Sequence, residues 1–226
     1  MSHTFRSIFD IIGPVMIGPS SSHTAGAVRL GRLARLVLGE KAAHAMIGLH
    51  GSFAQTHKGH GTDVALVAGL LDWNPDDARI PDSFRYAKEA GLDFSFQLID
   101  LGEQAHPNTA RLELTGLSGQ HSCVTGCSIG GGRVQITDID GFALEMGGEL
   151  PTLLVVHPDR PGAISQVTTV LFEHNVNIAA MRVSRQQKGS TALMVLETDQ
   201  PINDNVLHAL SALSLVDAVR RIDPLS

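Results

Sequence analysis

Five polar side chains stand in a row directly before a segment with helical spacing of apolar residues, and they are Ser20, Ser21, Ser22, His23 and Thr24. The start of a helix presents free backbone N–H groups and the positive end of the helix dipole, so it favours an anion such as a carboxylate. The hydroxyl groups add hydrogen-bond donors, and a histidine titrates near neutral pH. Ordinary capping by Ser22 or Thr24 needs only one hydroxyl. The cluster therefore predicts a functional site at this helix start.

A second polar cluster, His57 to Asp63, is expected to follow a strand and to open a helix. Gly59 and Gly61 would let a ligand approach the backbone, because glycine has no side chain. Two alternatives stay open at this point. Thr62 or Asp63 would cap the helix, and the two histidines would then be solvated.

A third cluster, His106-Pro107-Asn108-Thr109, precedes a predicted strand. A histidine and an asparagine beside a proline-fixed backbone could orient a polar substrate. The residues alone favour a plainer interpretation, a turn in which the asparagine forms a local hydrogen bond.

The two cysteines, Cys123 and Cys127, lie in a predicted strand, where their even spacing puts them on one face. Small core residues are the favoured interpretation over metal ligands. Two thiols cannot build a disulfide framework, and they cannot supply the four thiolates of a typical iron–sulfur cluster. The glycines 130–132 have no helix after them and predict a turn or bulge rather than a phosphate loop.

The elements that must position these clusters form an α+β domain in the first part of the chain. Hydrophobic spacing predicts helices at 25–38, 63–71 and 83–90, and strands at 44–50, 94–101, 110–115, 122–129 and 133–138. The strands around Arg111 and Arg133 alternate between polar and apolar residues, so each should have one wet face. Arg29, Arg32 and Arg35 are expected to form a solvated face of the first helix.

A glycine-rich segment at 146–151 predicts a linker, which divides the chain into domains at 1–147 and 148–226. After it, the pattern predicts a strand at 152–157, a helix at 162–175, a strand at 177–184 and its hairpin partner at 191–197. Asp204 is expected to cap a second helix, and a last strand falls at 219–222. This βαββαβ order is that of a ferredoxin-like sandwich.

Composition excludes several classes of function. The 226 residues include 17 Lys and Arg against 23 Asp and Glu, a net charge of −6, with no basic cluster, so the sequence does not predict nucleic-acid binding. No apolar run is long enough for a membrane span, and no basic segment precedes an apolar one as in a signal peptide. The expected location is the cytoplasm.

Taken together in order, the clusters resemble one family, the iron–sulfur L-serine dehydratases, which convert L-serine to pyruvate and ammonia. The similarity is specific to the beta chain of the two-chain form of that enzyme. It implies a 4Fe–4S cluster with ligands from a partner alpha chain, and no metal ligand in this chain. The segments that carry the resemblance are 17–24, 50–54, 58–63, 106–108 and 129–132.

The second domain resembles an ACT domain, similar to the serine-binding one of D-3-phosphoglycerate dehydrogenase, on the segments 157–162 and 175–180. The resemblance implies an effector site at His157, Asp159, Gly162 and Asn177. The dehydrogenase has asparagine where this chain has Asp159, whose carboxylate would repel the serine carboxylate but could pair with its ammonium group. The first domain is similar to the allosteric substrate-binding domain of the same dehydrogenase.

These observations lead to a mechanistic hypothesis in which His23 acts as the acid/base group, because its pKa range suits removal of the Cα proton. The residues expected to bind or support L-serine are Ser20, Ser21, Ser22, Thr24, Lys58, His60, Gly61, Thr62, His106 and Asn108. The expected assembly is a homodimer of this chain, or a heterotetramer with the alpha subunit.

Two other functions compete with this hypothesis. One is a regulatory serine-binding subunit that acts through the ACT domain without a catalytic role. The other is a self-sufficient Ser/His hydrolase, which no Gly-x-Ser-x-Gly segment or suitably placed Asp–His pair supports.

Overall fold

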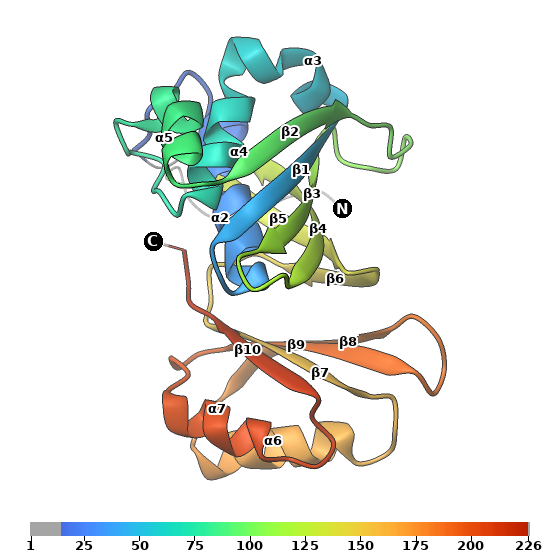
Figure 1. Cartoon of the computed structure of the whole chain (residues 1–226). Helices are drawn as coiled ribbons and strands as arrows, with labels where there is room; N and C mark the ends of the chain where they lie inside the picture. Colours follow the sequence, from blue (N-terminus) through green and yellow to red (C-terminus); the bar gives the residue numbers. More distant parts are fainter. Residues whose placement is uncertain (1–14, 226) are drawn as a thin grey trace. The chain divides into compact units, whose positions relative to one another are not determined.

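The computed structural model describes residues 15–225, so the first fourteen residues of the predicted N-terminal domain lie outside it. The chain divides into two compact units between Thr137 and Asp138. The structure contains two β-sheets, each with helices packed against it (Figure 1), and the last strand of the first sheet comes after this boundary in the chain. The α+β class predicted from the sequence is confirmed.

The first sheet has the strand order β2-β1-β3-β4-β5-β6. Strand β1 (Ala42–His50) runs parallel to β2 (Asp93–Leu98) and antiparallel to β3 (Asn108–Gly116), which pairs in turn with β4 (His121–Gly130). Strands β5 (Arg133–Ile139) and β6 (Phe142–Met146) complete it. Alternate residues such as Leu112, Leu114 and Ile136 are buried, so the predicted alternation of wet and dry faces is confirmed.

Two helices of the first unit pack against each other through glycines. They are α2 (Gly26–Leu38) and α4 (Thr62–Leu70), drawn beside the sheet in Figure 1. A side chain on Gly31 would collide with the Leu66 carbonyl, and one on Gly69 with the Val28 carbonyl. The close approach holds α2, and the polar segment before it, in a fixed place. A short helix, α5 (Ser83–Glu89), packs next to α4.

Among the described α-helices and β-strands, two were not predicted from the sequence, α3 (Gly51–His60) and β6. Helix α3 buries only Phe53, so it lacks the repeating apolar stripe that marks a surface helix. Its glycines and histidines are typical of a loop. The prediction that the His57–Asp63 cluster follows a strand is therefore wrong, because the cluster begins inside α3.

The prediction of a solvated arginine face on α2 is also wrong. Arg29, Arg32 and Arg35 are each only partly exposed and each forms a hydrogen bond. Arg29 donates to the Gly132 carbonyl at 3.2 Å, and Arg35 donates to the Leu70 carbonyl at 3.1 Å. Because α2 is covered on several sides, these side chains lie along its packing contacts rather than in open solvent.

Gly132 belongs to the predicted glycine turn, which joins β4 to β5. The φ angles of glycines 130–132 are all positive.

The second unit has the predicted βαββαβ order: β7 (Thr152–Pro158), α6 (Ala163–Glu173), β8 (Ile178–Arg185), β9 (Thr191–Thr198), α7 (Asp204–Ser211) and β10 (Ala218–Ile222). Its sheet order is β10-β7-β9-β8, and Figure 1 shows both helices on one face. Val155, Leu171, Met194 and Leu210 belong to the core between them. One detail was wrong: Asn203, not Asp204, caps α7, accepting a hydrogen bond from the Val206 N–H at 3.1 Å.

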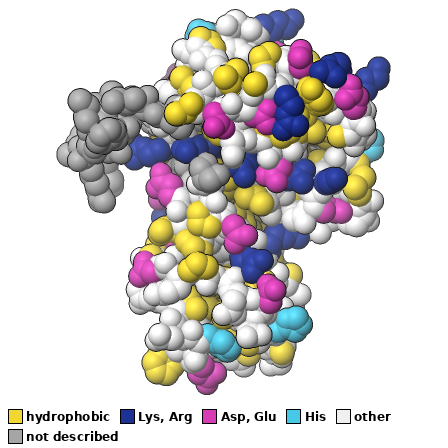
Figure 2. Space-filling model, turned by 90° about the vertical axis from the view of Figure 1, so that its left-hand side faces the viewer, with side chains coloured by type: hydrophobic (Ala, Val, Ile, Leu, Met, Phe, Trp, Pro, Cys, Tyr) yellow, Lys and Arg dark blue, Asp and Glu magenta, His cyan; other side chains and the backbone are white. Residues whose placement is uncertain are grey.

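The described surface mixes charges of both signs. On the face that Figure 2 shows, Lys and Arg side chains are interspersed with Asp and Glu. This mixture is what 17 basic and 23 acidic residues without a basic cluster imply.

Candidate active site

His23 lies in a single irregular helical turn, Ser21–Ala25, that runs directly into α2. The Ser20 hydroxyl caps this turn by accepting a hydrogen bond from the His23 backbone N–H at 3.2 Å. The capping alternative thus involves Ser20, rather than Ser22 or Thr24. Because one serine is enough for the cap, the hydroxyls of the neighbouring residues are available for other contacts.

Hydroxyl groups contact both nitrogens of the His23 ring. The Nδ1 atom lies 3.1 Å from the Ser22 Oγ and 3.4 Å from the Ser20 Oγ, and Nε2 lies 3.0 Å from the Ser52 Oγ. The side chain is 9% exposed. These contacts fix the orientation of the ring, and a hydroxyl can serve either nitrogen as donor or acceptor.

The surroundings of His23 favour a neutral imidazole. Burial, and secondarily the charge of the nearby His60, lower the pKa of His23 below its usual value of 6.5. The ring centroids of His23 and His60 are 4.8 Å apart, and Phe53 packs edge-on to His23 at 5.4 Å. An imidazole that is neutral at pH 7 has a free electron pair and can accept a proton.

The second cluster meets the first at the junction of α3 and α4. The Thr24 hydroxyl donates to the His60 carbonyl at 3.2 Å. Gly61 joins the two helices with a φ of +69°, a conformation that favours glycine. Thr62 is fully buried, and its hydroxyl has no hydrogen-bond partner among the described residues. Lys58 is exposed on α3.

The third cluster packs against the start of α3. The Pro107 carbonyl accepts a hydrogen bond from the Phe53 N–H at 3.3 Å, and Gly51 pairs with Asn108 as an isolated bridge. The Asn108 N–H also donates to His106 Nδ1 at 3.1 Å, so a local turn is present as well. The Asn108 side chain lies 3.5 Å from the Ser128 carbonyl. Asn108 is therefore next to the segment that carries Ser52, whereas His106 is exposed.

Two polar residues of this region were missing from the predicted site, Ser52 and Ser128. Ser52 contacts the His23 ring, and only its place in the 50–54 segment of the family resemblance could have found it. Ser128 is fully buried on β4, and its hydroxyl has no partner among the described residues. It lies against Gly26, the first residue of α2, where any side chain would collide with it.

The described residues of this chain do not fit an iron–sulfur cluster. No group of three or more His, Cys, Asp or Glu side chains in the described part of the chain is placed to hold a metal ion. Burial raises the pKa of the Cys127 thiol, which opposes the thiolate form that binds metals. Cys123 is only half buried, and the Arg111 side chain lies 3.3 Å from its sulfur.

Comparison with known proteins assigns the family. The family model described as "Serine dehydratase beta chain" matches residues 7–138, and that described as "ACT domain" matches residues 151–214. The chain belongs to the serine dehydratase beta-chain family.

Relatives support this membership along nearly the whole beta chain. It is 46% identical to a protein of Bacillus subtilis named "Probable L-serine dehydratase, beta chain", covering 96% of this chain and 98% of the relative. It is 40% identical to the "L-serine dehydratase, beta chain" of Peptoniphilus asaccharolyticus, covering 92% and 93% respectively. A D-3-phosphoglycerate dehydrogenase of Synechocystis is 29% identical over 83% of this chain and 34% of its own length.

Three of the four predicted effector residues in the ACT domain of this beta chain lie together: His157 is near the C-terminal end of β7, and Asp159 and Gly162 are in the loop that follows it. His157 is 2% exposed, its Nδ1–H donates to the Pro158 carbonyl at 2.9 Å, and its Nε2 has no partner among the described residues. The Asp159 carboxylate accepts from the Gly189 N–H at 2.9 Å and from Arg185 at 2.8 Å, and these bonds lower its pKa. Gly162, with a φ of +95°, directly precedes α6.

Asn177, the fourth predicted effector residue, lies elsewhere. It contacts Asp199 at one end of β9, whereas His157 pairs with Ala192 at the other end. Six residues of extended strand separate these positions by about 20 Å. One beta chain therefore does not bring Asn177 and His157 to the same small ligand.

No described helix is long and apolar enough to cross a membrane.

Proposed function

We propose that this chain is the beta subunit of an L-serine dehydratase and that it supplies protein groups of the active site to a complex with an alpha subunit. The observation that carries the proposal is the His23 ring, buried between hydroxyl groups at the start of α2 in a member of this family. In the proposed complex, the 4Fe–4S cluster is held by the alpha subunit. L-Serine is the substrate, pyruvate and ammonia are the products, and the location is the cytoplasm.

In this proposal, the substrate carboxylate binds where the hydroxyls of Ser20, Ser21, Ser22 and Thr24 surround the helix start. The positive end of the helix dipole supports a negative charge there. His60, whose carbonyl contacts Thr24, and Asn108 border the same region. Lys58 and His106 are exposed and would contribute at the edge of the site.

His23 accepts the Cα proton in the proposed mechanism. Ser52 holds Nε2 from one side, so Nδ1, which faces Ser20 and Ser22, is the nitrogen that takes the proton from carbon. The Cα proton and the β-hydroxyl leave together as one molecule of water, which gives an enamine. The enamine tautomerises to an imine, and hydrolysis of the imine consumes one water and gives pyruvate and ammonia. The lowered pKa of His23 keeps the imidazole neutral at pH 7, so that one of its nitrogens has a free electron pair.

The test is co-expression with the cysteine-rich alpha chain under anaerobic conditions, followed by measurement of pyruvate formed from L-serine. We expect activity from the pair, and neither activity nor an iron chromophore from this chain alone. Pyruvate formation by this chain alone in the absence of metal would overturn the proposal. A pair that forms and binds iron but gives no pyruvate would do the same.

A regulatory role is the second candidate, because the His157 Nε2 is buried without a partner and could accept a hydrogen bond from an ammonium or hydroxyl group. Calorimetry of the full chain with L-serine tests this role. Heat of binding that His157→Ala abolishes, with unchanged maximal activity of the α–β pair, would support a purely regulatory site in the ACT domain. Unaltered binding in that variant would exclude His157 from it.

A further inference from the structure

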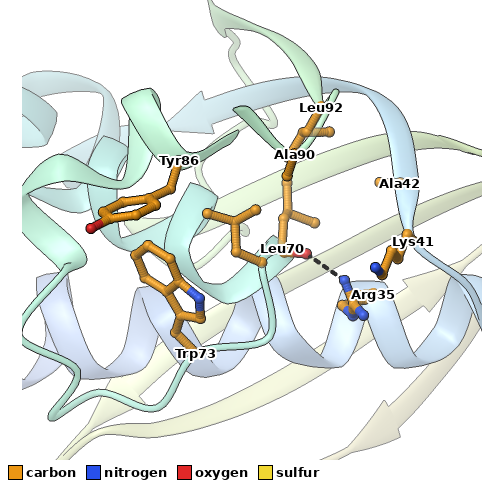
Figure 3. A pocket seen from close by; sticks show the side chains of 9 residues that line it. Arg35, Lys41, Ala42, Leu70, Trp73, Tyr86, Ala90 and Leu92 are labelled. Atoms are coloured by element: carbon orange, nitrogen blue, oxygen red, sulfur yellow. Dashed lines mark hydrogen bonds between the residues drawn. The ribbon is translucent and has the colours of Figure 1, made fainter. Parts of the chain in front are cut away.

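A cavity of about 230 Å³ lies in the first unit, away from the His23 cluster (Figure 3). It is enclosed by the C-terminal part of α2, the end of α4 and the segment from α5 to β2. Its characteristic side chains are Arg35, Lys41, Leu70, Trp73 and Tyr86. Arg35 lies nine residues after Gly26, about 14 Å along the axis from the start of α2. The cavity is therefore separate from the proposed catalytic residues.

One end of the cavity is aromatic and rigid. Trp73 and Tyr86 stack edge to face with their ring centroids 5.3 Å apart, and the Leu70 side chain lies beside them in Figure 3. The Arg79 guanidinium covers the Trp73 ring at 4.3 Å from its centroid, and Asp77 holds Arg79 through a salt bridge. This end offers a fixed apolar wall to a hydrocarbon group.

The other end of the cavity carries positive charge that no lining acid neutralises. Figure 3 shows Arg35 and Lys41 there, and the Arg35 guanidinium uses one N–H to reach the Leu70 carbonyl at 3.1 Å. Within the described residues, Lys41 has no ion pair, and the cavity lining includes no acidic side chain. Nearby arginines differ, because Arg32 pairs with Asp72 and Arg85 pairs with Glu89.

We propose that this cavity binds a small carboxylic acid with an apolar body. Arg35 and Lys41 bind the carboxylate, and Leu70, Trp73 and Tyr86 contact the hydrocarbon part. The volume lies below the roughly 300–1,000 Å³ of ordinary ligand pockets, which limits the ligand to a short branched or monocyclic acid. The proposal does not depend on the catalytic role of His23.

Trp73 makes the proposal directly measurable, because it is the single tryptophan of the chain. Intrinsic fluorescence of the full chain, or the one ¹⁹F resonance of chain labelled with 5-fluorotryptophan, therefore reports on this cavity alone. We expect 4-methylpentanoate to change the signal saturably. Its neutral isostere 4-methylpentanamide, acetate and inorganic phosphate should bind at least several-fold more weakly, because each lacks the charge or the apolar body.

Variants separate charge from shape. Lys41 is exposed, so Lys41→Gln should weaken 4-methylpentanoate binding by only about threefold to tenfold, and Lys41→Arg should preserve most of the affinity. Lys88→Gln removes the same charge from α5 outside the cavity and serves as the matched control. The proposal would be overturned if no saturable signal appeared, or if the amide or phosphate bound as tightly as the acid. An unchanged affinity in Lys41→Gln would also overturn it.

Discussion

The His23 site (Ser20 to Thr24 with Ser52) and the His157 site (the end of β7 and the loop after it) each bury a histidine, but the fold surrounds both ring nitrogens with protein groups in only one of them. Both ring nitrogens of His23 contact hydroxyl groups, one on the adjacent Ser22 and one on Ser52, which lies 29 residues after His23 in the chain. His157 has one nitrogen bonded to the carbonyl of the next residue, Pro158, and one without a partner in the described part of the chain.

The charged neighbours of the two histidines differ as well. Burial, and secondarily the charge of His60, lower the pKa of His23, which keeps that ring neutral at pH 7. Beside His157, the Asp159 carboxylate is already bound by Arg185 and by a backbone N–H. The comparison teaches that similar sequence signals mark two kinds of site. In one, the histidine is preorganised for chemistry; in the other, a ring nitrogen without a hydrogen-bond partner could bind a ligand.

The strongest test of this comparison removes the imidazole of His23. His23→Ala should lower kcat of the α–β pair by about 10²-fold to 10⁴-fold, the usual contribution of a general acid–base group. His157→Ala should leave kcat at saturating serine nearly unchanged. Steady-state pyruvate assays measure both, and copurification of the alpha subunit checks assembly. Near-normal turnover in His23→Ala would remove the catalytic assignment.

A smaller effect is expected when only the orientation of His23 is disturbed. Ser52→Ala removes the hydroxyl at Nε2 and should lower kcat about tenfold, in line with loss of one hydrogen bond in the transition state. Ser52→Thr, which restores a hydroxyl, should recover part of the rate. The matched control is Thr56→Ala, because that hydroxyl donates to the Ser52 carbonyl and not to the ring. Equal loss in both alanine variants would mean that Ser52 acts only on the stability of α3.

The pH dependence of kcat/KM tests whether the charged neighbour of His23 acts on its protonation. Because the pKa of His23 is lowered, the acid limb of kcat/KM should lie below pH 6.5. His60→Gln removes one cause of the lowering, so the limb should move to higher pH. The sign for stability is the same: the unfolded chain binds the proton more readily, so the contribution of His23 to stability decreases as pH falls below 6.5. An acid limb that stays in place in His60→Gln would contradict the coupling.

The smallest effect is expected in the second unit. Asp159→Asn removes the charge that holds Arg185, which leaves the guanidinium available for the carboxylate of serine. We expect serine binding to the full chain to tighten by about twofold to fivefold, the scale of an exposed ion pair. Calorimetry measures the change, with Asp217→Asn, a change of the same charge elsewhere in this unit, as the control. Weaker binding in Asp159→Asn would show that the carboxylate itself contacts the ammonium group.

Much of the fold could be predicted from local pattern, and the exceptions have physical causes. The strands that alternate polar and apolar residues and the helices with an apolar stripe were found to within about three residues at each end, because burial of one face leaves a periodic signal. Helix α3 buries only Phe53 and leaves no such signal. The arginines of α2 looked solvated because their partners, such as Gly132 and Leu70, lie 103 and 35 residues away in the chain.

The sequence by itself determined the order of the elements and the polar segment that opens α2, because both depend on residues close together in the chain. The contacts of His23 with Ser52, 29 residues away, and of Thr24 with His60, 36 residues away, exist only after β1, α3 and α2 pack together. Packing also decided that Asn177 and His157 lie at opposite ends of a sheet. Hydrogen bonds and pKa values depend on distances in space, so only the tertiary structure could assign a protonation preference to His23 and distinguish the two sites.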